Sequence, residues 1–260
     1  MAILTVYWQP GCTSCLKTKE FLRSHGVAFE SVNVREAPAA MARLAALGAR
    51  SVPVILRGDE FVYGQDLAAV ARFAGVTATL EHLPVPVLVS RLLALLDTAA
   101  ALAGQLPAGA LHVKLPGRER THLDLAYHVS QVVVGFLDAA LGGRLTFEHF
   151  ERTPPEHVNA AADVARLMRS VSQALAVWWG ANQSRLPAEL DTYYGRQPLH
   201  AVLERTTWHV AQHARQLERL LELRGVQLQP RLDPALLAGL PLPDDVWDAE
   251  VPLATSTHDG

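Results

Sequence analysis

Two cysteines and three histidines are the residues of this chain whose types and spacing suit chemistry best. Cys12 and Cys15 are the only cysteines among 260 residues, and the run Cys12-Thr13-Ser14-Cys15 follows an apolar stretch and precedes a helical pattern. A helix that begins at such a pair points its N–H groups and the positive end of its dipole at the first sulfur, which favours the thiolate. The spacing therefore predicts dithiol chemistry, in which Cys12 attacks a disulfide and Cys15 resolves the mixed disulfide.

Two other interpretations of the cysteine pair stay open. Half of a zinc site would need a second pair of ligands, and the only histidine close in sequence is His25. Two buried cysteines without a role would also explain the pair. Pro10-Gly11 directly before the pair is typical of an exposed turn, which favours the chemical interpretation.

The first 76 residues show the periodicity of a small α/β domain. Alternating or apolar runs predict strands over residues 3–7, 28–33, 52–57 and 60–63. Helical patterns that end at glycines predict helices over residues 14–25, 37–47 and 66–73. The expected order is β-α-β-α-β-β-α.

This part of the chain resembles the glutaredoxin and NrdH group of the thioredoxin fold. The matching segments are Cys12-Thr13-Ser14-Cys15, Ser51-Val52-Pro53 and Tyr63-Gly64-Gln65-Asp66, and the resemblance covers roughly residues 1–76. It implies a cis proline at Pro53 that faces the dithiol and a Val52 backbone that pairs with a disulfide substrate. Val52, Pro53 and Gly64 are therefore expected to bind substrate. The implied substrate is a low-molecular-weight thiol or a protein disulfide.

Length and composition predict a second domain. A chain of 260 residues is too long for one thioredoxin-like unit. We expect this domain at residues 1–78, a linker at 79–86, a second domain at 87–228, and a tail rich in proline and acid at 229–260. The tail is expected to lie on the surface or to be disordered.

Charge and hydropathy argue against nucleic acid and membrane partners. Lys and Arg number 23 against 26 Asp and Glu, and no basic run stands out. Residues 83–106 are nearly all apolar but include Arg91 and Asp97, so a buried helix is expected there instead of a membrane span. The N-terminus lacks the pattern of an export signal, and so few cysteines suit a reducing cytoplasm.

The second domain is predicted to be helical only. Helical patterns cover residues 87–105, 121–141, 158–182 and 198–224, with long loops at 107–120 and 144–157. Four helices of this length predict an up-and-down four-helix bundle.

Three histidines fall on the apolar faces of these helices. His209 and His213 share one face of the last helix with Leu217, and His128 lies on the apolar stripe of the second helix. Burying an unpaired polar ring costs about 1–3 kcal/mol, and a bound divalent metal would remove that cost. Three protein ligands would leave an open position, which is typical of a catalytic site. The alternative is that each ring hydrogen-bonds to a carbonyl or carboxylate.

The other eight histidines, at 25, 82, 112, 122, 149, 157, 200 and 258, are interpreted as surface, loop or cap residues.

This half resembles the DinB and YfiT superfamily of metal-binding four-helix bundles. The resemblance rests on Ala126-Tyr127-His128 and on the HxxxH spacing of His209 and His213, and it covers roughly residues 86–226. It implies a divalent ion, most often zinc or nickel, completed by water. Some members use small thiols as isomerases or S-transferases, and homodimers are common.

Together the two halves predict a thiol-dependent oxidoreductase or transferase with a dithiol and a three-histidine metal site. Two alternatives stay open. The bundle could bind or sense metal without turnover while the redox domain reports thiol state. The protein could also be an electron donor of the NrdH kind that uses the bundle for docking.

Overall fold

The computed structural model describes residues 3–78 and 82–253. Among them, residues 3–78 with 243–252 form one compact unit, and residues 82–242 form the other. Residues 79–81 of the predicted linker and residues 254–260 of the predicted tail lie outside the described residues.

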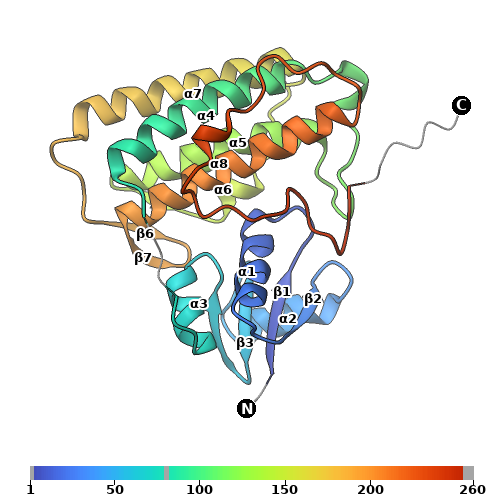
Figure 1. Ribbon diagram of the computed structural model, residues 1–260, viewed down its shortest axis with the longest axis vertical. Helices are drawn as coiled ribbons and strands as arrows, with labels where there is room; N and C mark the ends of the chain where they lie inside the picture. Colours follow the sequence, from blue (N-terminus) through green and yellow to red (C-terminus); the bar gives the residue numbers. More distant parts are fainter. Residues whose placement is uncertain (1–2, 79–81, 254–260) are drawn as a thin grey trace, which may run out of the picture. The chain divides into compact units, whose positions relative to one another are not determined.

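The N-terminal unit is built on a four-stranded sheet (Figure 1). Its strands are β1 (Leu4–Trp8), β2 (Phe29–Asn33), β3 (Val54–Arg57) and β4 (Glu60–Tyr63), in the order β2-β1-β3-β4. β1 pairs parallel to β2 and antiparallel to β3, which pairs antiparallel to β4. The helices are α1 (Thr13–Ser24), α2 (Pro38–Ala46) and α3 (Leu67–Ala74). The predicted element order and thioredoxin-like fold are confirmed.

Two apolar clusters hold this sheet between its helices. One joins side chains of β1, β3, α1 and α3, among them Val6, Leu22, Ile55 and Val70. The other joins β1 and β3 to α2, and Cys15 belongs to it. The second cysteine is therefore fixed in packed core, where thiols are among the most readily buried groups.

Residues 243–252 add a segment to this unit that the sequence analysis placed in the tail. The Lys19 side chain of α1 is fully buried, and its Nζ lies 2.5 Å from Asp248 Oδ2 and 2.8 Å from Glu250 Oε1. The same Nζ lies 3.4 Å from the centroid of the Trp8 ring. Asp248 is only 5% exposed and Trp247 only 8%. These contacts fix part of the C-terminal segment on α1.

Four long helices form the other unit, α4 (Val85–Gly104), α5 (His122–Ala140), α7 (Ala161–Asn182) and α8 (Leu199–Glu222). They lie side by side in Figure 1, and the most extensive contacts are those of α4 and of α5 with α7 and α8. The start of α5 is fixed by a capping box between Thr121 and Asp124.

Helix α4 is long and apolar enough to cross a membrane by length and composition. Its buried leucines and alanines face α7 and α8, as expected of a core helix. A buried core helix can have this length and apolar composition without entering a membrane.

The expectation of helices only in this half needs correction. The predicted loop at 144–157 contains β5 (Arg144–Leu145) and α6 (Glu148–Glu151), and the segment before α8 forms β6 (Glu189–Thr192) and β7 (Gly195–Pro198). These strands make a small sheet in the order β5-β6-β7. Two short 3-10 helices, η1 (Ala108–Ala110) and η2 (Pro234–Leu236), complete the elements. Strands of two to four residues are too short for alternation to reveal.

Candidate functional site

The cysteine pair occupies the N-terminus of α1 as a disulfide. Cys12 is the N-cap residue, and the Cys15 N–H donates to Cys12 Sγ at 3.2 Å. Cys15 is fully buried, whereas Cys12 is half-buried. In the reduced state the N–H donor and the helix dipole would stabilise a thiolate on Cys12. Of the two cysteines, only Cys12 is partly accessible to solvent.

The predicted substrate-binding residues lie next to this turn. The Val52–Pro53 peptide is cis, as the resemblance implies, and the Gly64 N–H donates to the Pro53 carbonyl at 2.9 Å. Val52 shares an apolar cluster with Cys15, against which Cys12 packs. Their roles in binding stay predictions.

Thr18 ties the segment at Gly64 to the cysteine turn. Its Oγ1 lies 2.8 Å from the Ser14 carbonyl oxygen and 3.1 Å from that of Gly64. A Cβ at Gly64 would lie 2.5 Å from Thr18 Oγ1 and 2.8 Å from Pro53 Cγ. Glycine is therefore required at position 64 for the close approach of the two segments.

The structure brings the three predicted histidines together inside the helical unit. His128 comes from α5, and His209 and His213 come from successive turns of α8. The three rings are 4%, 6% and 1% exposed. One ligand atom from each lies within 4.8 Å of the others, so a single ion can reach all three after small ring rotations.

The hydrogen bonds of these rings leave nitrogens for a metal. His213 Nδ1 lies 2.8 Å from Gln216 Oε1, so Nδ1 carries the proton and Nε2 keeps its lone pair. Within the described part of the chain, His213 Nε2, His128 Nδ1 and His209 Nδ1 are buried without a hydrogen-bond partner. Buried polar atoms rarely lack a partner, and a metal ion would supply one.

Burial also keeps the three rings neutral. It lowers the pKa of His213 to about 3, although the Gln216 hydrogen bond acts in the opposite direction. Burial, the nearby Arg120 guanidinium and the neighbouring rings hold the pKa of His128 well below 6.5. Burial, His213 and Arg205 do the same for His209. Neutral imidazole is the form that binds metal, so the donor set fits a divalent ion of the zinc type.

Several residues around this cluster were not predicted from the sequence. The Phe150 ring of α6 lies 5.7 Å from the His128 ring and 5.9 Å from the His209 ring, between centroids. Its carbonyl accepts a hydrogen bond from Arg120 Nη2 at 2.9 Å. Arg205 and Gln216 stand one turn from the α8 ligands, so the same helical spacing that found the histidines could have found them.

Two histidines interpreted as surface, loop or cap residues are buried. His149 is 3% exposed, and its Nε2 lies 2.8 Å from Asp138 Oδ2, while His122 is 2% exposed. A Cβ at Gly135 of α5 would lie 3.2 Å from the His149 ring, so this glycine allows α6 to approach α5 closely. His149 thereby fixes the segment that carries Phe150. His149 lies in a predicted loop and His122 at the start of a predicted helix, and neither position gave a sign of burial.

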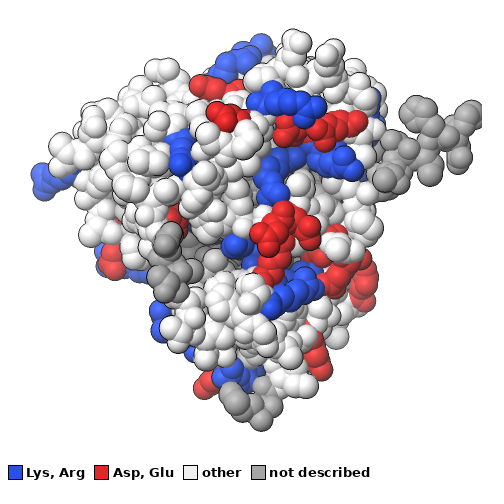
Figure 2. Space-filling view, in the orientation of Figure 1, with Lys and Arg blue, Asp and Glu red and all other residues white. Residues whose placement is uncertain are grey.

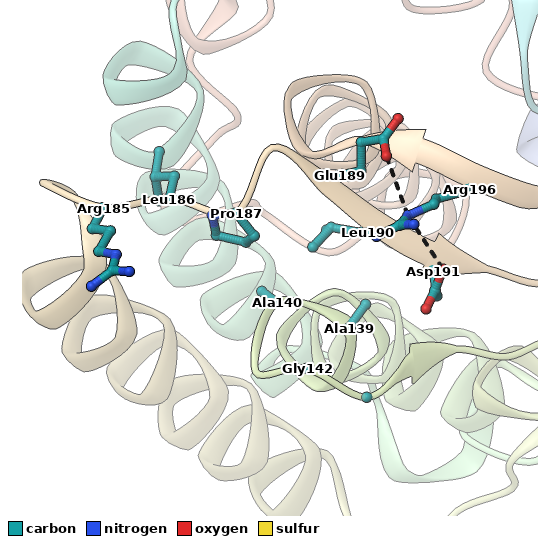
Figure 3. A pocket seen from close by; sticks show the side chains of 11 residues that line it. Ala139, Ala140, Gly142, Arg185, Leu186, Pro187, Glu189, Leu190, Asp191 and Arg196 are labelled. Carbon is teal, nitrogen blue, oxygen red and sulfur yellow. Dashed lines mark ion pairs between the residues drawn. The ribbon is translucent and has the colours of Figure 1, made fainter.

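A pocket of about 480 Å³ lies elsewhere in the helical unit (Figure 3). It is lined by the end of α5, by Arg185 and Pro187, and by β6 and β7, where Arg196 pairs with Glu189 and Asp191. Ala139 in its wall is 11 residues beyond His128, roughly 16 Å along the helix. The pocket is separate from the histidine cluster.

Charges of both signs are interspersed on the surface drawn in Figure 2. Lys and Arg side chains lie beside Asp and Glu, and no broad field of one sign covers that face. The expectation that nucleic acid is not a partner stays a prediction.

Comparison with known proteins finds relatives of the N-terminal unit. Residues 4–62 match the family model for glutaredoxin. The chain is 41% identical over 56 residues to the glutaredoxin-like protein NrdH of Salmonella typhimurium, which covers 22% of this chain and 69% of that protein. The NrdH protein of Escherichia coli is 38% identical over 56 residues, which is 22% of this chain and 69% of that protein. The NrdH protein of Lactococcus lactis subsp. lactis is 33% identical over 57 residues, which is 22% of this chain and 79% of that protein. No solved structure matches the chain significantly. The family match ends at residue 62, before the helical unit begins.

Proposed function

The chain belongs to the glutaredoxin family through its N-terminal unit, and from that premise we propose that it is a thiol-dependent oxidoreductase or transferase with a second, metal-binding centre in its helical unit. The dithiol would exchange disulfides, and the three histidines would hold a divalent ion that binds the second reactant. The observation that carries the proposal is the convergence of three buried imidazoles with orphaned nitrogens, in a chain that also holds the cysteine pair.

The redox half follows from the position of the two sulfurs. The Cys12 thiolate attacks a substrate disulfide, forms a mixed disulfide and releases one substrate thiol, which takes up a proton. The Cys15 thiolate then attacks the Cys12 sulfur and releases the second substrate thiol. The product is the Cys12–Cys15 disulfide seen in the structure. Two electrons from another thiol pair, of a small thiol or a protein dithiol, restore the reduced state.

The metal half rests on the ligand set of α5 and α8. We infer a bundle of the DinB and YfiT type, in which His128, His209 and His213 would hold zinc or nickel. Such an ion would lower the pKa of a thiol or water bound at its open position. The chain itself supplies neutral rings and a Gln216 oxygen that fixes the His213 tautomer. The Phe150 ring lies beside those of His128 and His209, with centroids 5.7 and 5.9 Å away, and contributes an apolar wall to the site.

Fusion of the two centres serves a common thiol substrate. A tether keeps the concentration of one centre near the other on the order of millimolar. A small thiol released from a mixed disulfide on Cys12 would be a ligand of the kind that the metal site is proposed to bind.

Two cysteine variants test the redox half. Cys12→Ser should abolish reduction of a small disulfide, because the attacking sulfur is lost. Cys15→Ser should accumulate a mixed disulfide on Cys12, visible as added mass in intact-protein mass spectrometry. Full activity of Cys12→Ser would overturn the assignment of Cys12 as nucleophile.

The metal half is tested by thiol transfer to electrophilic acceptors, with several low-molecular-weight thiols and with or without added zinc or nickel. Metal-dependent transfer that is lost in His209→Ala, His213→Ala supports a transferase. Metal binding without turnover would instead favour a sensing bundle.

The names of the relatives favour a second candidate, an electron donor of the NrdH kind. In that case His209→Ala, His213→Ala would reduce protein disulfides at the wild-type rate. Neither this variant nor the wild type would transfer a thiol to an electrophilic acceptor.

A further inference from the structure

The Lys19 ammonium group belongs to the face of α1 that begins at the cysteine pair. Lys19 follows Cys15 by four residues and Cys12 by seven, so the three side chains project from the same side of the helix. The rise of the helix places the Cα atom of Lys19 roughly 6 Å from that of Cys15 and roughly 10 Å from that of Cys12 along the axis. A charge at position 19 is therefore close enough to act on either sulfur.

The surroundings of Lys19 contain little water. Its side chain has no exposed surface, and its Nζ lies 3.4 Å from the centroid of the Trp8 ring. Trp8 is 1% exposed and belongs with Cys15 to one apolar cluster, against which Val251 of the C-terminal segment, residues 243–252, also packs. Charges in such surroundings are screened less than charges on the surface, so they act more strongly on their neighbours.

Two carboxylates of the C-terminal segment outweigh the charge of Lys19. Asp248 Oδ2 lies 2.5 Å from Lys19 Nζ, and Glu250 Oε1 lies 2.8 Å from it. Ser31 Oγ donates to both carboxylate oxygens of Glu250, at 3.1 and 2.9 Å, which fixes their position. Arg23 also reaches Glu250, at 3.2 Å, but its side chain is 54% exposed, so water screens its charge. The buried group thus combines one positive charge with two negative ones.

We propose that Asp248 and Glu250 lower the reduction potential of the Cys12–Cys15 couple by offsetting the charge of Lys19. This inference rests on the redox half of the proposed function. Reduction produces a thiolate on Cys12, so a nearby positive charge favours the reduced state and a nearby negative charge favours the disulfide. The two carboxylates therefore make the couple a stronger reductant than Lys19 alone would. They act through Lys19 and are positioning residues.

The segment that carries these carboxylates follows the helical unit in sequence. Residues 1–78 alone would contain Lys19 but neither Asp248 nor Glu250. A redox unit without the rest of the chain would therefore be a weaker reductant. The C-terminal segment thus gives the full chain a control over its reducing strength.

Equilibration of full-length variants in glutathione buffers at pH 7 tests the proposal, with glutathione used only as a redox couple of known potential. Two molecules of reduced glutathione deliver two electrons and two protons to the Cys12–Cys15 disulfide and leave as oxidised glutathione. Acid quenching, alkylation and intact-protein mass spectrometry give the fractions of dithiol, disulfide and mixed disulfide. These fractions yield the equilibrium constant for reduction.

Asp248→Asn combined with Glu250→Gln removes both negative charges with little change of shape. The equilibrium constant for reduction should rise about tenfold, the size expected for charges roughly 10 Å away in a partly buried site, which corresponds to about 30 mV. Adding Lys19→Met should lower the constant again by about threefold or more, because it removes the positive charge. Glu250→Gln alone changes a partly exposed side chain and should raise the constant about threefold, which keeps the proposal testable if the combined variants fail to fold.

Asp59→Asn combined with Glu60→Gln is the matched control, because it also removes two negative charges from the N-terminal unit. Both residues are exposed at the turn between β3 and β4. The pairing of Thr5 with Leu56 places that turn at the end of the sheet opposite the cysteine turn. This control should keep the wild-type equilibrium constant.

The outcomes separate this inference from the proposed function. An unchanged constant in Asp248→Asn, Glu250→Gln, or a rise that Lys19→Met does not reverse, would overturn the effect of charge and leave the dithiol assignment intact. A wild type whose disulfide is not reduced in any of these buffers would overturn the redox half and the inference with it. General damage to the unit would not be repaired by a third substitution, so reversal by Lys19→Met identifies charge as the cause.

Discussion

His213 shows how a single hydrogen bond can prepare a metal ligand. Gln216 accepts from Nδ1, which leaves the Nε2 lone pair in a buried place without a partner. Retaining such an atom is costly unless something else binds it. His128 and His209 each present a similar orphaned nitrogen. The three rings converge in one place, where one nitrogen from each lies within 4.8 Å of the others, so a single ion can bind all three rings.

The lowered pKa values of these rings predict metal binding that is insensitive to mild acid. A proton competes with a metal only below the pKa of the metal-free ring. Burial lowers that pKa to about 3 for His213 and well below 6.5 for His128 and His209. The dissociation constant for zinc should therefore change less than about tenfold between pH 7 and pH 5.5, where three ordinary imidazoles would lose affinity by a factor on the order of several hundred.

Competition with a chromophoric chelator of known pH dependence measures this constant, and calorimetry in buffers of different ionisation enthalpy counts the protons. Few protons should be released per ion bound at pH 6. Release of two or three protons, with a steep fall in affinity, would show that the rings are charged in the metal-free protein.

Gly64 predicts a second effect at the scale of one residue. In Gly64→Ala the new methyl group would press on Thr18 Oγ1 and Pro53 Cγ, at 2.5 and 2.8 Å before any adjustment. Overpacking of this kind costs about 1–3 kcal/mol of unfolding free energy, and it would move Pro53 relative to the cysteine turn. We expect the N-terminal unit to lose that stability and disulfide reduction to slow, as measured by urea unfolding and a disulfide-reduction assay.

Gly180 of α7 provides the control, because a Cβ there meets no atom within 4 Å. Gly180→Ala should leave reduction unchanged and should gain about 0.5–1 kcal/mol, the usual helix preference for alanine. Equal behaviour of the two variants would contradict the close packing at Gly64.

Some site residues could be predicted from the sequence and others could not, for physical reasons. Cysteines three apart and histidines on apolar faces stand out because their chemistry conflicts with simple burial. Gln216 and Arg205 lie on the same helical face as the α8 ligands but fit an ordinary polar pattern. The burial of His149 depends on Gly135 and Asp138, which belong to another element, so no local pattern could reveal it.

At the scale of elements, α1 carries the cysteine turn and also the attachment point of residues 243–252. Lys19 has no exposed surface, and its partner Glu250 lies 231 residues away in sequence. In the sequence Lys19 has the pattern of an ordinary helix lysine, and residues 243–252 have that of a polar tail. Only tertiary contact reveals that they belong together. The long helices, in contrast, follow from periodicity within each segment.

The contacts of Lys19 with Asp248 and Glu250 predict a large effect from the loss of a single carboxylate. Asp248→Ala would leave the buried Lys19 ammonium with Glu250, whose side chain is 37% exposed. Removing one partner of a buried charge should destabilise the N-terminal unit by about 2–4 kcal/mol. Hydrogen exchange of the α1 peptide, residues 13–24, gives a local readout and should accelerate accordingly.

The exposed pair of Lys114 and Glu119 gives a matched comparison, with side chains 60% and 84% exposed. Glu119→Ala should change stability by less than about 0.5 kcal/mol. Lys19→Met combined with Asp248→Leu should recover much of the loss, because apolar side chains of similar volume can replace a buried pair. Unchanged exchange in Asp248→Ala would show that residues 243–252 do not stabilise α1.

At the scale of the whole molecule, the chain joins a glutaredoxin unit to a helical unit with its own candidate centre. The family comparison covers residues 4–62, so the redox unit is supported by sequence, fold and relatives alike. The helical unit is supported by the periodicity of its helices and by the convergence of its histidines. Its metal is therefore the claim on which the joint function depends.

Metal content of the purified full chain tests that claim most directly. Inductively coupled plasma mass spectrometry should find about one divalent ion per chain in the wild type, as expected for one three-histidine site. His209→Ala, His213→Ala should lose it, and the matched variant His112→Ala, His157→Ala, which changes two exposed histidines, should retain it. A wild type that stays metal-free after incubation with zinc or nickel, or a His209→Ala, His213→Ala variant that keeps its ion, would contradict the account.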